Sequence, residues 1–322
     1  MGAKLREYRR RIRSVQSTKK ITRAMELIAA SRIVRAQNRM NSAKPYAKEL
    51  RDALAEIGGD STLTHPMLTG VEEPRRAGIL VITSDRGLAG GYNANALKAA
   101  NELADRLAGE GKDVDRYVIG RKGVGYYRFR NVALAGSWTG FSEQPHFLDV
   151  RGATETVEAA LTATSAGDVE EGRPGIDELW VVYTRFVNSV TQTATAVQVS
   201  PVRAGSDDET GEADEVDEPE QNEDGEDANS GALYEFEPEL SELVAALLPR
   251  YISSRIFSAL LESAASESAA RRRAMKSASD NATELIRTYT RLANQARQAE
   301  ITQEISEIVG GADALAAAGS EE

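Results

Sequence analysis

The chain has 322 residues, which is enough for more than one folding unit, because single domains usually run to ~100–200 residues. It has no cysteine and only two histidines, His65 and His146, which excludes a disulfide framework, a thiolate metal site and a histidine-rich metal cluster. The hydrophobic fraction of 41% is sufficient for a core, and the aromatic fraction of 6% favours long helices over a bulky globular interior.

The formal net charge of −11 is distributed very unevenly along the chain. Residues 206–231 carry 13 acidic side chains and no basic one, and without them the formal charge of the remainder would be +2. Residues 1–51, in contrast, contain 15 Lys and Arg residues against three acidic ones. The segment 204–232 has too little apolar surface to offset the chain entropy of folding, so we predict that it is disordered.

The N-terminal segment, residues 3–57, predicts one long helix. It contains no glycine, its single proline is Pro45, and its apolar residues recur in steps of three and four, as a coiled-coil seam requires. At ~1.5 Å per residue this helix would be roughly 80 Å long, more than a globular core needs. The expected seam residues are Leu5, Tyr8, Ile12, Val15, Ile21, Met25, Ile28, Met40, Ala43, Ala47, Leu50, Leu54 and Ile57.

The C-terminal segment, about 238–311, has a matching pattern that we expect to end at Gly310-Gly311. A helix this polar gains most of its stability from packing, so the two apolar stripes predict that the helices pair in an antiparallel arrangement. The expected seam residues are Leu240, Leu243, Leu247, Tyr251, Ile256 and Leu260, then Ala278, Ala282, Leu285, Tyr289, Leu292, Ala296 and Ala299, with Ile301, Ile305 and Ile308 shifted off the stripe.

The middle of the chain alternates short β-branched runs with helical patterns, which predicts an α/β domain with a mostly parallel sheet. The expected strands are 77–83, 114–120 and 178–186, with a further strand 191–199 joined through a hairpin at Asn188-Ser189. The expected helices are 93–108, 121–130 and 152–164, and 165–175 is expected to be a loop. The predicted fold is a Rossmann-like α/β domain inserted between long terminal helices that pair as an antiparallel coiled coil. Its parts are an N-terminal helix (1–57), the α/β domain (75–203), the acidic segment (204–232) and a C-terminal helix (233–315).

The string TSDRGLAGGYN, residues 83–93, follows a strand and precedes a helix, where a dinucleotide-binding fold would hold a phosphate. Its glycines, Gly87, Gly90 and Gly91, fit neither G-x-G-x-x-G nor the P-loop, so a structural turn is favoured. His65 and His146 have no acidic or nucleophilic neighbour in sequence, which favours surface or packing roles for both. No catalytic, cofactor-binding or metal-binding residue is expected.

Two other functional classes remain as alternatives. A nucleotide-binding α/β protein with helical arms would need a phosphate loop and an acid/base pair, and neither is recognisable. A coiled-coil nucleic-acid adaptor would use the basic residues of 1–57, but these surround the helix and no aromatic residues interleave for base stacking. The N-terminus lacks the apolar region of a secretory signal, and no stretch approaches the ~20 apolar residues of a membrane span. An intracellular protein, soluble or peripheral to a membrane, is expected.

Five strings spread along the chain resemble the gamma subunit of the F-type ATP synthase. They are VQSTKKITRAMELIAASRIVRAQ (15–37), ITSDRGLAGGYN (82–93), YEFEP (234–238), ESAARRRAMKSASDNA (267–282) and ARQAEITQEISEIVGGADAL (296–315). The resemblance implies a central-stalk rotor that binds no nucleotide itself and couples rotation of the c-ring to conformational cycling of the catalytic beta subunits. The terminal helices would lie inside a ring of three alpha and three beta subunits, and the α/β domain would rest on epsilon and the c-ring. No nucleic acid and no direct membrane insertion are expected, and the complex would lie at the cytoplasmic face of a bacterial membrane.

The same resemblance assigns contacts between rotor and stator, residue by residue. Arg297, Gln298 and Thr302 match the polar residues that meet loops of the beta subunits. Arg271, with Glu267 near it, matches a residue that meets an acidic beta loop. Met25 stands where an added positive charge impairs coupling in the family, so Met25→Lys is expected to lower coupling without unfolding the shaft.

Two segments depart from the family pattern: the acidic insert 205–231 and the extended loop 165–175. Both adjoin the α/β domain. A solvated linker is the favoured interpretation of the acidic insert, and electrostatic contact with a basic neighbour that restrains ATP hydrolysis is the alternative.

Overall fold

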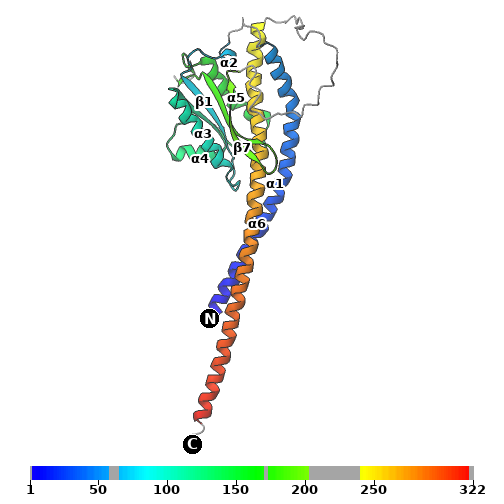
Figure 1. Cartoon of the computed structure of the whole chain (residues 1–322), viewed down its shortest axis with the longest axis vertical. Helices are drawn as coiled ribbons and strands as arrows, with labels where there is room; N and C mark the ends of the chain where they lie inside the picture. Colours follow the sequence, from blue (N-terminus) through cyan, green and yellow to red (C-terminus); the bar gives the residue numbers. More distant parts are fainter. Residues whose placement is uncertain (1, 58–64, 170–172, 203–239, 319–322) are drawn as a thin grey trace, which may run out of the picture. The chain divides into compact units, whose positions relative to one another are not determined.

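The computed structural model of the chain describes residues 2–57, 65–169, 173–202 and 240–318. Contacts divide the chain into two units, one made of residues 31–270 and the other of residues 1–30 with 271–322. Two long helices, α1 (Gly2–Ile57) and α6 (Leu240–Ala318), contribute to both units (Figure 1). The predicted acidic segment 204–232 lies outside the described residues, as do residues 233–239 of the predicted C-terminal helix 233–315.

The unit of residues 31–270 is built on a five-stranded sheet with the order β3-β2-β1-β6-β7. The parallel pairs are β1 with β2, β1 with β6 and β2 with β3, whereas β7 pairs antiparallel with β6. The Asn188 N–H donates to the Thr191 carbonyl in the turn between β6 and β7, as expected for the predicted hairpin. The strands are β1 (Arg76–Ile82), β2 (Asp113–Ile119), β3 (Gly136–Trp138), β6 (Glu178–Phe186) and β7 (Gln192–Ser200).

Helices cover both faces of this sheet, and alternate residues of each strand supply the two cores. Ile79 and Val81 face α3 (Tyr92–Gly109) and α4 (Arg121–Phe129) in one apolar cluster. Leu80 and Ile82 belong to the other cluster, with residues of α5 (Phe147–Ala163), the short α2 (Pro66–Thr69) and the first part of α6. Burial on both faces explains why the central strands are continuous apolar runs in the sequence.

Two boundaries in this unit differ from the sequence prediction. The segment 165–175, expected to be a loop, contains the paired strands β4 (Asp168–Val169) and β5 (Arg173–Pro174), which are too short to leave a pattern in the sequence. Helix α5 begins at Phe147 instead of 152, because the Asp149 carboxylate accepts a hydrogen bond from the His146 N–H and caps the first turn.

In the unit of residues 1–30 with 271–318, α1 and α6 run antiparallel. The Tyr8 and Tyr289 rings stack with centroids 6.4 Å apart, and the Thr22 and Ser279 hydroxyls share a hydrogen bond of 2.7 Å. The predicted fold class, an α/β domain between paired terminal helices, is thus confirmed. The least exposed residues of both helices recur in steps of three and four: Leu5, Tyr8, Ile12, Val15, Lys19, Thr22, Glu26 and Ala29 in α1, and Met275, Ser279, Ala282, Ile286, Tyr289, Ala293, Ala296 and Glu300 in α6.

This observed seam corrects the predicted one at four residues and at its end. Ile21, Ile28 and Leu285 are 58%, 53% and 45% exposed, because an unbroken heptad runs through polar and small residues that an apolar count passes over. Ala299 is also exposed. Gly310-Gly311 does not end α6, which continues to Ala318, since glycine costs a helix only ~1 kcal/mol per residue and does not forbid it.

Candidate protein-contact surface of the helical pair

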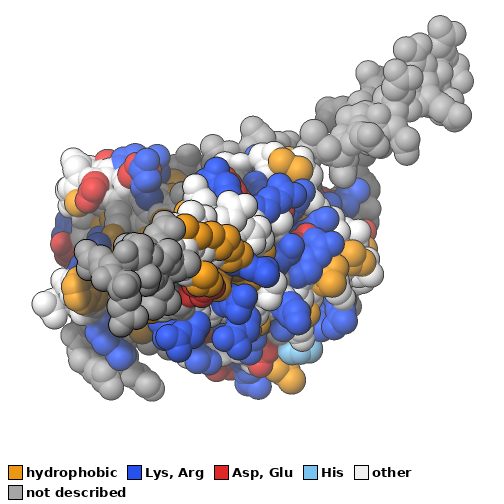
Figure 2. Space-filling view, turned by 90° about the horizontal axis from the view of Figure 1, so that it is seen from below, with side chains coloured by type: hydrophobic (Ala, Val, Ile, Leu, Met, Phe, Trp, Pro, Cys, Tyr) orange, Lys and Arg blue, Asp and Glu red, His pale blue; other side chains and the backbone are white. Residues whose placement is uncertain are grey.

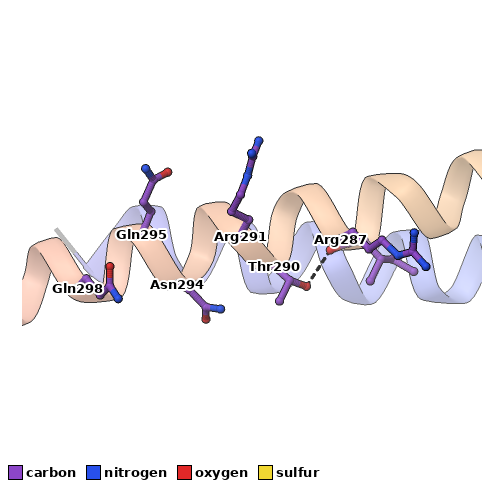
Figure 3. A pocket seen from close by; sticks show the side chains of 7 residues that line it. Arg287, Thr290, Arg291, Asn294, Gln295 and Gln298 are labelled. Atoms are coloured by element: carbon purple, nitrogen blue, oxygen red, sulfur yellow. Dashed lines mark hydrogen bonds between the residues drawn. The ribbon is translucent and has the colours of Figure 1, made fainter.

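A shallow groove of about 540 Å³ runs along α6 in the unit of residues 1–30 with 271–318. Figure 3 shows Arg291 and Gln295 projecting to one side of α6, and Thr290 and Asn294 to the other. The Thr290 hydroxyl donates a 2.7 Å hydrogen bond to the Ile286 carbonyl of its own helix. The lining residues are Ile286, Arg287, Thr290, Arg291, Asn294, Gln295 and Gln298.

The groove is rich in hydrogen-bond donors, and its lining has no acidic side chain. Two guanidinium groups, Arg287 and Arg291, stand four residues apart and therefore share one face of the helix. Guanidinium and amide groups suit the recognition of carboxylates and backbone carbonyls. The one hydroxyl of the lining, that of Thr290, donates to the Ile286 carbonyl, so the groups that the groove presents to a partner are mainly guanidinium and amide groups.

The three polar residues predicted near the end of α6 are placed at or beside this groove. Arg297, Gln298 and Thr302 are all exposed, and Gln298 lines the groove itself. Thr302 lies four residues after Gln298, so the two share a face of α6. Sequence reasoning missed Arg287 and Arg291, although a polar run spaced i, i+4 opposite the seam could have indicated them.

The other three predicted residues are not surface groups of the same kind. Met25 is half-buried beside the seam of α1. Glu267 and Arg271 are only 1% and 5% exposed, so a partner loop could reach these side chains only after local movement. Their role as partner contacts stays a prediction.

Beyond the groove, α6 presents an exposed apolar row. Ile301, Ile305 and Ile308 follow one another in steps of four and three, and Ile308 is 72% exposed. On α1, Ile21, Leu27 and Ile28 are exposed as well. Exposed apolar rows of this kind mark surfaces that bind other proteins.

Polar contacts fix how the two helices meet. Besides the Thr22–Ser279 hydrogen bond, the Arg11 guanidinium lies 5.7 Å from the Tyr289 ring centroid. A hydrogen bond with Tyr289 and the charge of Glu7 raise the pKa of Arg11. Buried polar contacts within a coiled-coil seam specify its register, at some cost in stability.

The family model for ATP synthase matches residues 4–315. The curated ATP synthase gamma chain of Frankia casuarinae is 54% identical over 318 residues, which covers 98% of this chain and 99% of that one. The chain belongs to the ATP synthase gamma-chain family.

Other relatives give the same picture. The ATP synthase gamma chain of Acidothermus cellulolyticus is 53% identical over 321 residues, covering 100% of both chains, and that of Streptomyces coelicolor is 51% identical, covering 98% of this chain and 97% of that one. As a member of this family, the chain is a central-stalk subunit of ATP synthase, a complex associated with a membrane.

Solved structures share the fold. A chain of the Euglena gracilis mitochondrial ATP synthase, from a structure of OSCP, F1 and the c-ring, aligns with a TM-score of 0.63 and 16% identity, covering 98% of this chain and 95% of that one. A chain of the Tetrahymena thermophila central stalk and c-ring aligns with a TM-score of 0.53 and 21% identity, covering 80% and 99%.

In this gamma chain the glycine-rich string after β1 forms a turn that hydrogen bonds hold to other parts of the α/β unit. The Asp85 carboxylate accepts hydrogen bonds from the backbone N–H groups of Arg121 (3.1 Å), Gly140 (2.8 Å) and Ser142 (3.0 Å). Arg121 is the first residue of α4, so the Asp85 carboxylate at the end of β1 also accepts from the first N–H of the helix that follows β2. Asp85 thus ties the turn after β1 to α4 and to the segment after β3, which favours the structural-turn interpretation of residues 83–93.

Two further observations bear on ligands and membranes. Among the described residues, no group of three or more His, Asp or Glu side chains could hold a metal ion.

By length and composition alone, the stretch Glu242–Gly310 of α6 contains one window apolar enough to cross a membrane, with 39% of that window buried. Core helices pass the same test, and Leu248, Ile252 and Ile256 of this stretch are fully buried against the sheet.

Proposed function

We propose that this chain is the rotor of the central stalk, and that α1 and α6 turn inside a ring of three alpha and three beta subunits. The observation that carries the proposal is the surface of α6 in the helical unit: a polar groove without acidic residues, followed by exposed Ile301, Ile305 and Ile308. Such a surface is costly for a protein that works alone, and it suits a helix enclosed by partners.

The chemistry of this surface matches the demands of a turning shaft. Contacts that must break and re-form cannot be deeply buried, and exposed ion pairs contribute only about 0–1 kcal/mol each. Arg287, Arg291, Arg297 and Gln298 can exchange partners among acidic or carbonyl-rich loops of successive beta subunits without becoming trapped by one. Glu267 and Arg271, which are buried, would act by positioning α6 unless a loop draws them out.

The α/β unit would serve as the foot, with epsilon and the c-ring as its partners. The chain would be a non-catalytic subunit, because the glycine spacing of residues 83–93 matches no phosphate-binding motif and the groove on α6 has no acid/base pair. It would act peripherally at the cytoplasmic face of a bacterial membrane and regulate ATPase activity and proton flow through the coupling itself.

The experiment that tests the proposal is the paired substitution Gln298→Ala and Thr302→Ala in the assembled enzyme. Loss of two polar contacts on one face is expected to lower the yield of complex and ATP-driven proton pumping several-fold. Gln303→Ala is the matched control, because the Gln303 amide bonds Glu307 of the same helix at 2.8 Å and faces elsewhere. Normal yield and pumping in the paired variant would refute the contact assignment.

A second experiment addresses α1. Met25 is half-buried, so Met25→Lys places an ammonium group where it can reach an acidic loop of a surrounding subunit. We expect fewer protons pumped per ATP hydrolysed, with unchanged helical content of the chain. An unaltered pumping ratio would contradict the assignment of Met25.

A further inference from the structure

A second groove, of about 360 Å³, lies wholly within the unit of residues 31–270. It is formed by α1, by the end of β6 and by the middle of α6. Its floor includes the buried Leu261, and the Phe186 N–H at its edge donates a 3.3 Å hydrogen bond to the Glu262 carboxylate. The lining residues are Gln37, Met40, Lys44, Ala47, Arg51, Arg185, Phe186, Val187, Arg255, Ser258, Leu261 and Glu262.

The lining of this groove is strongly basic. Lys44, Arg51, Arg185 and Arg255 contribute four positive charges from three different elements, against the single carboxylate of Glu262. Lys44 is exposed, and Arg51 and Arg255 are half-buried, so the charges reach the mouth of the groove. Figure 2 shows Lys and Arg side chains spread over one face of the molecule, with few acidic side chains between them. Converging cations of this kind favour a polyanionic occupant.

We propose that the basic groove, defined by Lys44, Arg51, Arg185 and Arg255, binds the acidic tract 206–231 of the same chain. Charge complementarity is the first argument: the tract has 13 carboxylates and no basic residue. The second is tethering, because the tract is covalently joined to α6, one wall of the groove. An attached partner reaches an effective concentration on the order of mM, which allows individually weak ion pairs to act together.

The connecting chain is long enough for this docking. Asp227, the last acidic residue of the tract, precedes Leu240 by 13 residues, which can span up to roughly 43 Å at ~3.3 Å per residue. Arg255 lies 15 residues into α6, about 23 Å from its start at ~1.5 Å per residue. The tract can therefore reach the groove with slack, and can lie along it without unwinding α6.

Zero-length carbodiimide cross-linking of the assembled complex tests the proposal, because it joins amines to carboxylates only when they are in contact. We expect Lys44 to cross-link to peptides of 206–231 about tenfold more than Lys98 does, and the yield to fall at high salt. Lys98 is the reference amine, since it lies on α3 outside the groove and pairs with Glu102.

Substitutions then distinguish binding in the groove from a general attraction between the acidic tract and any basic residue. Arg51→Gln with Arg255→Gln should lower the Lys44 cross-link several-fold, whereas the matched Arg250→Gln, on α6 outside the lining, should leave it unchanged. Circular dichroism shows whether each variant keeps its helices. Equal cross-linking at Lys44 and Lys98, an effect of Arg250→Gln as large as that of the groove variants, or capture of Lys44 by another subunit in place of the tract would each overturn the proposal.

Discussion

The α/β unit and the helical unit are held together by different physical means. Around the sheet, the fully buried side chains are large and apolar, including Ile79, Leu80 and Ile119. In the helical unit, the residues that face the partner helix include the polar Thr22, Glu26 and Ser279 alongside apolar residues, many of them only half-buried. The comparison teaches that the α/β unit is stabilised by fully buried apolar volume, whereas the helical unit mixes polar and apolar contacts at its seam and leaves some large apolar side chains, such as Ile28 and Ile305, exposed.

The largest expected effect is in the α/β unit, at Gly120. This residue has φ +102°, and an added Cβ would lie 2.1 Å from the Thr83 carbonyl oxygen. We expect Gly120→Ala to cost on the order of 3 kcal/mol or more, because both backbone strain and a steric clash result. Gly125→Ala, within α4, which begins directly after Gly120, has open space around it and should instead stabilise by about 0.5–1 kcal/mol.

Urea unfolding followed by tryptophan fluorescence measures the stability of the α/β unit in both variants. The chain has two tryptophans, Trp138 and Trp180, and both belong to the sheet of the α/β unit. Equal unfolding midpoints for the two alanine variants would show that the tight backbone approach at Gly120 is not a source of rigidity in the foot.

The next effect is pH-dependent and concerns Asp177. Burial tends to raise the pKa of this carboxyl group, but hydrogen bonds from the backbone N–H groups of Ser165, Arg75 and Arg76 outweigh it, so the pKa is lowered. The stabilisation is therefore present above the unfolded-state pKa of about 3.9 and is lost as the pH falls through the lower folded-state pKa.

Asp177→Asn should accordingly cost about 1–3 kcal/mol at neutral pH, with the difference from the unsubstituted chain shrinking in acid. Urea unfolding at a series of pH values checks this. Asp113→Asn is the control, because Asp113 is exposed and bonds Arg76 at the surface. A stability difference for Asp177→Asn that stays constant down to strongly acidic pH would contradict the proposed cause.

The smallest expected effect is in the helical unit. Thr22→Val and Ser279→Ala should each cost about 1 kcal/mol, because each removes the hydrogen bond between the two hydroxyls, although the Thr22 hydroxyl keeps its bond to the Lys19 carbonyl in Ser279→Ala. The double variant should cost less than the two together. Thermal unfolding followed by the helical circular dichroism signal tests this, with Thr18→Val as control, since the Thr18 hydroxyl bonds Ser14 of its own helix. If the cost of the double variant equals the sum of the two single costs, the two hydroxyls do not interact and the contact does not fix the register.

The same contrast explains what the sequence could predict. Strands β1 and β6 are buried on both faces, so their β-branched runs stand out, and the long glycine-free segment before Gly58 predicts α1. The seam was misplaced at Ile21, Ile28 and Leu285 because burial of Thr22 or Glu26 depends on the partner helix and not on local hydrophobicity. The role of Asp85 could not be predicted either, since its donors, Arg121, Gly140 and Ser142, are distant in sequence.

Rotation of single molecules tests the central claim most directly. The chain has no cysteine, so Lys98→Cys on α3, an exposed position, provides a unique site for a reporter bead or dye. With the surrounding alpha and beta subunits fixed to a surface, the account predicts that ATP drives the label around in one direction, with three dwell positions in each turn. ATP hydrolysis at a normal rate with a label that stays fixed relative to those subunits would contradict it.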